Sequence, residues 1–392
     1  MTRAQESWRG LLLAGAPIGG CRANIKVPCP LASEARGRAA SHPMEVPDYS
    51  QVYAFSNLYA AFRKARRGKR SRPEVAAFEY NLEAELLSLS DELATCSYRP
   101  GPYRSFIVRE SKRRLVSAAP FRDRVVHHAL INIIEPLFEQ RFMADSYANR
   151  VGRGTHRALD RCQQFARRYP YVLQCDVRQF FPSIDHAILR SCLAHHIPDE
   201  GTMWLVDQVL ESGVGVLSQE YTMAWFQGDD LMAALRARGL PIGNLTSQFW
   251  ANVYLHDLDQ FIKRRLRCPA YLRYMDDFLL FADDKHSLWE WREAIINRLA
   301  KLRLTLHERR AQVYPVSEGV PFLGFRLYPD HRRLKSARGY VFRRRLKTLV
   351  SQCQNGELDT VGITAVVQGW VAHAAHGDTW GLRRAVLSSV VL

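Results

Sequence analysis

The segment "LRYMDDFLLFADD", residues 272–284, places two acidic residues side by side between two short apolar runs. Both flanks are rich in aromatic and aliphatic residues, so the segment predicts a β-hairpin with Met275, Asp276 and Asp277 near its tip. A solvated turn needs only one carboxylate, and two adjacent carboxylates repel each other. A polyvalent cation is one of the few partners that makes such a pair favourable. The hairpin therefore indicates either a plain turn or half of a metal site.

A second strand with an acidic end favours the metal site. "YVLQCDV", residues 171–177, is a short apolar strand that ends near Asp176. If this strand and the hairpin are neighbours in one sheet, three carboxylates come together. Such a group suits two divalent cations about 4 Å apart, which activate a hydroxyl and stabilise a leaving pyrophosphate. Because neighbours along a strand face opposite ways, we expect Asp276 to take a larger share of the coordination than Asp277.

The charge of the chain points to a polyanionic partner. Among 392 residues, 55 are Lys or Arg and 39 are Asp or Glu, which gives a formal net charge of +16. Such an excess is typical of proteins that bind polyanions. Leu11–Gly20, the longest apolar stretch near an end, is too short to span a membrane. Eight cysteines without a CxxC pair favour reduced thiols, so we expect a cytoplasmic protein with no membrane partner.

The remaining pattern alternates strands with helices. Two strands around a basic turn are predicted within residues 103–121, and a further hairpin within 319–329. A Gly/Pro loop leads into a helix with Thr246 or Ser247 at its start. Residues 1–50 show no periodicity and are interpreted as a disordered or spurious extension, with Met44 as the working start. Other helices are predicted around 52–62, from Phe78 to Leu89, from Val125 to Leu137, over 155–168, within 184–212 and 229–238, over 287–303, and from about Arg332 onward.

Three short motifs, taken together, resemble those of reverse transcriptases. Tyr274-Met275-Asp276-Asp277 is similar to the family's Y-x-D-D, and Asp176 with Phe181 is similar to its first palm motif. Phe322-Leu323-Gly324-Phe325 is similar to its primer-grip hairpin. One four-residue match is weak, but several in the family order are a strong indication. The resemblance covers roughly residues 52–380 and implies an RNA-directed DNA polymerase, a nucleotidyltransferase, of the right-hand α+β fold.

The resemblance also implies domains, cofactor and partners. Residues 51–170 would form the fingers and the first palm segment, 171–315 the palm with its antiparallel sheet and catalytic motifs, 316–331 the primer-grip hairpin, and 332–392 a short helical thumb. The expected cofactor is Mg²⁺, as two ions, with Mn²⁺ as a substitute. The expected partners are template RNA, a DNA or cDNA primer-template and dNTPs.

Site residues follow from the same motifs. Catalysis is expected from Asp176, Asp276 and Asp277, and metal binding from these three together with Val177. An aromatic ring at Phe181 leaves no room for a 2′-hydroxyl and thereby selects dNTPs, whereas Phe180 is expected in the core. The expected dNTP-binding residues are Arg109, Arg113, Phe181, Ile242 and Gly243. The expected nucleic-acid-binding residues are Arg66, Arg67, Lys69, Arg70, Ser247, Gln248, Phe322, Leu323 and Gly324.

Structural interpretations compete with some of these roles. The basic loop "RKARRGKRSR", residues 63–72, is equally well explained as a solvated connection or as a phosphate contact. Arg122 and Arg124, in "FRDRVV", resemble a family signature but suit an ion pair with Asp123 or another acid equally well. Arg309 and Arg310 stand where the family often has a Lys. Because the pKa of arginine is too high for general acid catalysis, we expect an electrostatic clamp there.

One departure suggests a subfamily. Most reverse transcriptases have a Gln before the Gly of the loop that precedes the template-side helix, whereas this chain has Ile242 before Gly243. "IGNLTSQ", "FFPSID" and the short C-terminus resemble the reverse transcriptases of diversity-generating retroelements. That resemblance implies error-prone, adenine-mutagenised copying of a template-repeat RNA for retrohoming, and a small basic oligomeric accessory variability protein as partner.

Three alternatives stay open. A group II intron maturase would need a long RNA-binding domain after the thumb, and only about sixty residues follow the primer-grip motif. A defence-associated reverse transcriptase would share the palm. A catalytically silent RNA-binding protein on the same fold is disfavoured by the intact Asp176, Asp276 and Asp277.

Overall fold

The computed structural model describes residues 48–109 and 113–389. They form two compact units, one within residues 46–320 and the other within residues 321–392. The expected N-terminal extension, up to residue 47, and Lys112 of the basic turn lie outside the described residues. Within the described ranges, no helix is long and apolar enough to cross a membrane. The domain boundaries expected from the sequence stay a prediction.

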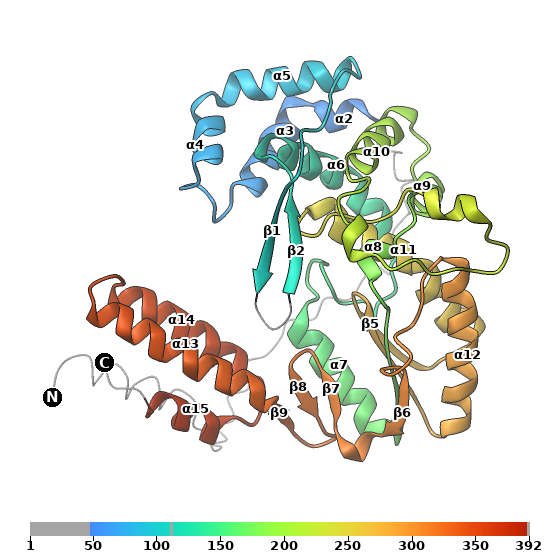
Figure 1. Cartoon of the computed structure of the whole chain (residues 1–392), viewed down its shortest axis with the longest axis vertical. Helices are drawn as coiled ribbons and strands as arrows, with labels where there is room; N and C mark the ends of the chain where they lie inside the picture. Colours follow the sequence, from blue (N-terminus) through green and yellow to red (C-terminus); the bar gives the residue numbers. More distant parts are fainter. Residues whose placement is uncertain (1–47, 110–112, 390–392) are drawn as a thin grey trace, which may run out of the picture. The chain divides into compact units, whose positions relative to one another are not determined.

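A four-stranded antiparallel sheet is the centre of the larger unit (Figure 1). Its strands are β3 (Tyr171–Asp176), β4 (Ala270–Tyr274), β5 (Asp277–Ala282) and β6 (Gln312–Pro315), in the order β4-β5-β3-β6. The predicted strand and the predicted hairpin are confirmed, and they are neighbours. Strand β6 was missed, because four residues that include Gln and Pro show no strand alternation.

The register of this sheet assigns its side chains to two faces. Leu173 lies opposite Leu280 and Cys175 opposite Phe278, and all four side chains join the main hydrophobic core. That core also takes up α11 (Leu245–Gln260) and α12 (Lys285–Lys301). The other face packs on α7 (Thr155–Arg168), where the rings of Phe165 and Phe281 are 5.7 Å apart. Alternation along the strands places Asp176 and Asp277 on this second face.

A helical cluster and a long hairpin occupy the first part of the same unit. The helices are α2 (Ser50–Tyr53), α3 (Phe55–Ala65), α4 (Pro73–Tyr80), α5 (Leu82–Ala94) and α6 (Phe121–Glu139). The hairpin consists of β1 (Arg104–Arg109) and β2 (Arg113–Ala118), and it extends away from these helices (Figure 1). A single helix from Phe78 to Leu89 was wrong. Asn81 has a backbone conformation outside the helical region, so the pattern is divided between α4 and α5.

Short helices connect β3 to α11. They are α8 (Phe180–Ser183), α9 (His186–Ala194), α10 (Glu200–Ser212) and the 3₁₀ turns η1 (Ser218–Glu220) and η2 (Leu231–Leu235). Helix α11 begins at Leu245 after the N-cap Asn244, one residue before the predicted Thr246, and continues into the π-helical turn η3 (Phe261–Arg265). A further 3₁₀ turn, η4 (Val316–Glu318), follows β6.

The C-terminal unit has its own sheet and core. A three-stranded antiparallel sheet contains β7 (Val320–Phe322), β8 (Phe325–Leu327) and β9 (Arg332–Leu334). Leu323 and Gly324 have positive φ values of 45° and 92°, the conformation of a tight two-residue hairpin turn. Helices α13 (Ser336–Gln354), α14 (Thr360–Ala374) and α15 (Trp380–Leu387) follow and share a separate core. The predicted hairpin is confirmed, and so is the helical C-terminus, except that its first residues, Arg332–Leu334, form strand β9 and the helices begin at Ser336.

Candidate active site

Asp176 and Asp277 are direct partners across two antiparallel strands. Asp176 is the last residue of β3, Asp277 is the first of β5, and the register pairs them. Directly opposed residues project from the same face of a sheet. Both side chains are half-buried at the edge of the core rather than inside it. Two carboxylates separated by about one hundred residues in the chain are thereby neighbours in space.

Asp276 lies in the turn between β4 and β5. Tyr274 pairs with Asp277, so Met275 and Asp276 form a two-residue hairpin loop, in which Met275 has a φ of +61°. The carbonyl oxygen of Asp276 accepts a hydrogen bond from the backbone of Val177 at 3.2 Å. The backbone of the third acid is therefore attached directly to the end of β3. Whether Asp276 takes the larger share of metal coordination stays a prediction.

A buried ion pair supports the β4–β5 hairpin from the core side of the sheet. The guanidinium of Arg273 and the carboxylate of Asp259 are both fully buried, with Nη2 and Oδ2 2.7 Å apart. Arg273 also donates to the Met275 carbonyl oxygen at 3.1 Å and to the side chain of Asn252. The carboxylate raises the pKa of Arg273 despite its burial. This network was not predicted from the sequence, although Arg273, a charged residue on the core side of a predicted strand, was an indication of it.

A second network orients Asp277. The amide nitrogen of Gln174 lies 3.4 Å from Oδ1 of Asp277, and the Gln174 amide oxygen accepts from the hydroxyl of Tyr314 at 3.0 Å. Gln174 and Tyr314 come from β3 and β6, so the missed strand completes the surroundings of the acid. This chain of hydrogen bonds restricts the rotamers of Asp277.

Arg310 contacts Asp176 at the end of strand β3. Its Nη1 donates to Oδ2 of Asp176 at 2.6 Å, and the two side chains are 48% and 23% exposed. The family resemblance implies that Arg309 and Arg310, which stand where a Lys is common, act as an electrostatic clamp. The structure shows instead an ion pair with one of the candidate metal ligands.

The donor chemistry fits magnesium, but the residues do not form a complete cage. Within the described residues, no three Asp, Glu, His or Cys side chains are grouped closely enough to hold a metal ion. The three expected carboxylates therefore do not form such a group, and Asp176 forms an ion pair with Arg310. Mg²⁺ nevertheless requires few protein ligands, because it is typically held by one or two carboxylates together with waters and substrate phosphates. Asp176 and Asp277 satisfy that requirement.

The candidate nucleotide contacts lie on two elements. Phe180 is buried, whereas Phe181 is half-buried and packs edge-on against it with ring centroids 5.5 Å apart. Phe181 therefore keeps an accessible surface, as its expected role requires. Arg109 and Arg113 are cross-strand partners at the end of the β1–β2 hairpin, and the side chain of Arg113 is exposed.

The loop with Ile242 is attached to the same hairpin. The carbonyl oxygen of Ile242 accepts from the backbone of Ser117 at 2.8 Å. Gly243 has a φ of +116°, and a Cβ there would lie 2.8 Å from a methyl group of Val116, so only glycine fits. Asn244, fully buried, donates to Ser117 and accepts from Ala119. This loop is thus a rigid bridge between β2 and α11.

The cations of the basic loop differ in their surroundings. Arg66 and Arg70 both bond to Glu79, which supports the structural interpretation for these two. Arg67 is exposed. Partial burial and the nearby Arg124 lower the pKa of Lys69. Arg70 is also largely exposed, so phosphate contact by these four cations stays a prediction.

Burial limits some of the other candidate nucleic-acid contacts. Ser247 is only 2% exposed, so its side chain has no surface with which to touch nucleic acid, whereas Gln248 is half-buried. In the C-terminal unit, Phe322 is fully buried and Gly324 is buried, and Leu323 at the turn is half-buried. The hairpin tip, rather than the Phe322 ring, is the accessible part of that motif.

The structural interpretation holds for Arg122 and Arg124. Arg122 forms two hydrogen bonds with Glu92, at 2.7 and 3.0 Å, and Arg124 pairs with Glu74. Asp123 instead accepts from the Tyr98 hydroxyl and from a backbone N–H. Both arginines thus brace α6 against α4 and α5.

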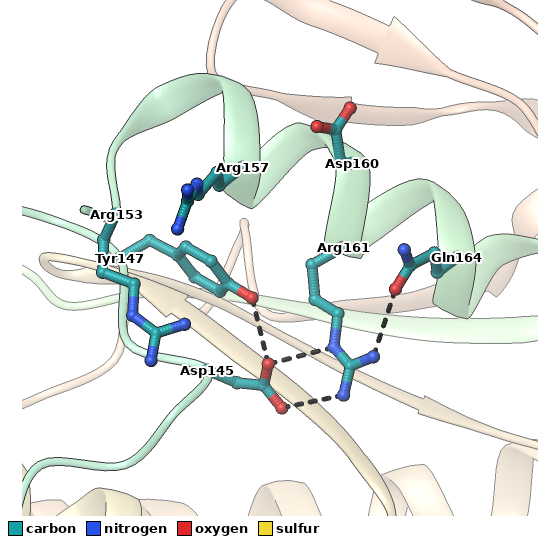
Figure 2. Close-up of a pocket in the computed structure, with 7 residues that line it drawn as sticks. All are labelled: Asp145, Tyr147, Arg153, Arg157, Asp160, Arg161 and Gln164. Carbon is teal, nitrogen blue, oxygen red and sulfur yellow. Dashed lines mark hydrogen bonds and ion pairs between the residues drawn. The ribbon is translucent and has the colours of Figure 1, made fainter. Parts of the chain in front are cut away.

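A polar pocket of about 350 Å³ lies along α7 (Figure 2). Arg161 and the Tyr147 hydroxyl converge on Asp145, whose carbonyl oxygen accepts from the backbone of Arg273 in β4. The hydroxyls of Thr155 and Tyr274 are 3.1 Å apart. No sequence motif indicated this pocket, and its internal ion pair supports the outer edge of the hairpin.

The family of this chain follows from a comparison with known proteins. The family model described as "Reverse transcriptase (RNA-dependent DNA polymerase)" matches residues 104–327, more than half of the chain. The match runs from β1 to β8 and includes both acidic strand ends. The fold is therefore that of a right-hand polymerase, an RNA-directed DNA polymerase by class of enzyme. The chain belongs to the reverse transcriptase family.

The individual relatives share only about a quarter of their aligned residues with this chain. "Protein YkfC" of Escherichia coli (strain K12) is 25% identical over 296 residues, which cover 64% of this chain and 73% of the relative. "Group II intron-encoded protein LtrA" of Lactococcus lactis subsp. cremoris is 26% identical over 219 residues, which cover 55% of this chain and 34% of the relative. Among solved structures, apo telomerase from Candida tropicalis matches with a TM-score of 0.44 and 10% identity over 62% of this chain and 59% of that chain.

Proposed function

We propose that this chain copies an RNA template into DNA by metal-dependent nucleotidyl transfer at the shared end of β3, β4 and β5. The observation that carries the proposal is the antiparallel register that places Asp176 opposite Asp277 in a chain of the reverse transcriptase family. Asp176, Asp277 and the turn residue Asp276, with Val177 beside them, are the proposed metal-binding set. Two carboxylates and a backbone oxygen are the hard donors that Mg²⁺ prefers.

The roles of the other residues follow from their positions. Bound Mg²⁺ supplies the positive charge that activates the attacking 3′-hydroxyl and stabilises the leaving pyrophosphate. Arg113, exposed at the end of the β1–β2 hairpin, provides charge for the triphosphate, and Arg109 is its cross-strand partner. Phe181 restricts the space beneath the sugar. Gln174 fixes the orientation of Asp277.

Metal removal tests this proposal. A purified chain treated with EDTA should lose all incorporation of a labelled dNTP on a primed RNA template, because the charge developing on pyrophosphate is then uncompensated. Added Mg²⁺ should restore incorporation, and Mn²⁺ should substitute for it. Incorporation that continues at full rate in EDTA would refute a metal-dependent mechanism.

A finer proposal concerns the kind of retroelement. The relative named as a group II intron-encoded protein, LtrA, supports an intron-type lineage for the palm. The Ile242-Gly243 loop carries the second candidate, an error-prone enzyme of the diversity-generating type. Ile242 is half-buried in a loop held by β2, and its side chain offers neither a hydrogen-bond donor nor an acceptor. Misincorporation at template adenines, with a small basic accessory protein as partner, would follow from that type.

A further inference from the structure

An arginine contacts Asp176, the carboxylate that the proposed function assigns to metal binding. The 2.6 Å hydrogen bond between Arg310 and Asp176 joins residues that are 134 positions apart in the chain. The contact is therefore a product of the fold and not of local sequence. It places one positive charge directly on an oxygen that the proposed function assigns to a metal ion.

The backbone holds Arg310 in this position. β6 pairs with β3 only as far as Gln174. Beyond that point the segment around Leu306 pairs with Val177. In this segment, the backbone N–H of His307 donates to the Asp176 carbonyl oxygen at 2.8 Å. Arg310 closes a turn by donating its own backbone N–H to the His307 carbonyl oxygen at 2.8 Å. The same loop thus binds the backbone of Asp176 and presents a cation to its side chain.

We propose that Arg310 is a metal-displaceable latch. In the metal-free enzyme it neutralises Asp176, and a divalent cation has to displace the guanidinium before the catalytic site is complete. The inference rests on the proposed function, since it concerns the metal site of that same reaction.

The electrostatics favour such an exchange. Asp176 and Asp277 are direct cross-strand partners, and like charges at such positions destabilise the fold unless a cation lies between or beside them. Arg310 offsets this repulsion before the metal arrives. Its side chain is half-exposed, so the ion pair is weak enough for a doubly charged ion to replace it. A fully buried pair, such as Arg273 with Asp259, would not be exchangeable in this way.

The test measures metal binding rather than catalysis. Mn²⁺ is titrated into the full chain without nucleotide or template, and free Mn²⁺ is followed by electron paramagnetic resonance. Arg310→Gln should bind Mn²⁺ roughly two- to five-fold more tightly than the wild type, the range that a half-exposed ion pair supplies. Arg310→Lys, which keeps the charge, should return toward the wild-type affinity. Arg309→Gln is the matched control, because it removes the adjacent exposed charge without touching Asp176.

Asp176→Asn separates the two possible failures. If Asp176→Asn weakens Mn²⁺ binding while Arg310→Gln leaves it unchanged, the latch is refuted and the metal site stands. Equal binding by the wild type and Asp176→Asn would refute the metal site itself. If Arg309→Gln tightens binding as much as Arg310→Gln, the effect is one of general charge, and a specific latch is again contradicted. Circular dichroism spectra of all variants verify that each one folds.

Discussion

At the scale of single residues, the site depends on which side chain opposes which. Asp176 and Asp277 are brought together by strand register, whereas Asp276 is placed by a two-residue turn. Phe180 and Phe181 divide between core and surface as their sequence context predicted. The role expected for Ile242 in fidelity depends on the hydrogen-bonding groups that its side chain lacks. A Gln at this position could both donate and accept a hydrogen bond, whereas Ile can do neither.

The fidelity prediction follows from that difference. A lost hydrogen bond of about 0.5–1.5 kcal/mol corresponds to about a 2- to 12-fold change in selectivity. Ile242→Gln should therefore reduce misincorporation opposite template adenine by a factor in this range, measured by sequencing cDNA made on one RNA template. Equal error rates in both enzymes would remove Ile242 from the fidelity determinants. Accurate copying of adenines by the wild type, even with its accessory protein, would rule out the diversity-generating type.

At the scale of elements, the hairpin that carries the acids is anchored to α11 by a buried charge pair. Arg273 in β4 contacts Asp259 and Asn252 in α11 and also the turn at Met275. This network connects the helix that follows the Ile242 loop to the hairpin that carries Asp276. Removal of one member leaves its partner charged and unpaired in the core.

The stability prediction uses this pair. Arg273→Leu should lower the free energy of unfolding by about 3–5 kcal/mol, because Asp259 is then buried without a counter-charge. The double variant with Asp259→Leu should recover much of the loss. Arg298→Leu is the matched control, since Arg298 pairs with Asp257 of the same helix at the surface and should cost at most about 1 kcal/mol. Urea denaturation measures all three, and equal losses for Arg273→Leu and Arg298→Leu would contradict the account.

Local pattern predicted most elements of the palm, while long-range contacts were out of its reach. Strand β3 and the β4–β5 hairpin were predicted because their apolar and aromatic runs are continuous and end in acids. Strand β6 is too short to show alternation, and the division at Asn81 depends on a single backbone conformation. The pairs Arg273–Asp259 and Arg310–Asp176 are set by tertiary packing, so a sequence alone does not indicate which arginine meets which acid.

At the scale of the whole molecule, a net charge of +16 predicts that phosphate contacts dominate RNA affinity. The structure shows which cations of the basic loop already have an acidic partner. Arg66 and Arg70 are occupied by Glu79, whereas Arg67 is exposed and the pKa of Lys69 is lowered by its surroundings. We therefore expect the basic loop to contribute less to RNA binding than its composition suggests.

The salt dependence of RNA binding tests this division. The logarithm of the binding constant should fall linearly with the logarithm of salt concentration, with a slope that decreases by about 0.7–0.9 for each phosphate contact removed. Arg67→Gln with Lys69→Gln removes two cations and should reduce the slope by about 1.4–1.8 in total. The paired variant Arg66→Gln with Arg70→Gln should change the slope less. An unchanged slope in the first variant would make the loop a solvated connection only.

The most direct measurement of the central claim is single-nucleotide incorporation by site variants on a primed RNA template. Asp176→Asn and Asp276→Asn should each slow incorporation by roughly 10³-fold or more, the loss of several kcal/mol of charge stabilisation, while RNA binding changes little. Asp283→Asn, an exposed acid just after β5, should behave as the wild type. Incorporation at the wild-type rate by Asp176→Asn or Asp276→Asn would contradict the proposal that the shared end of β3, β4 and β5 is the catalytic centre.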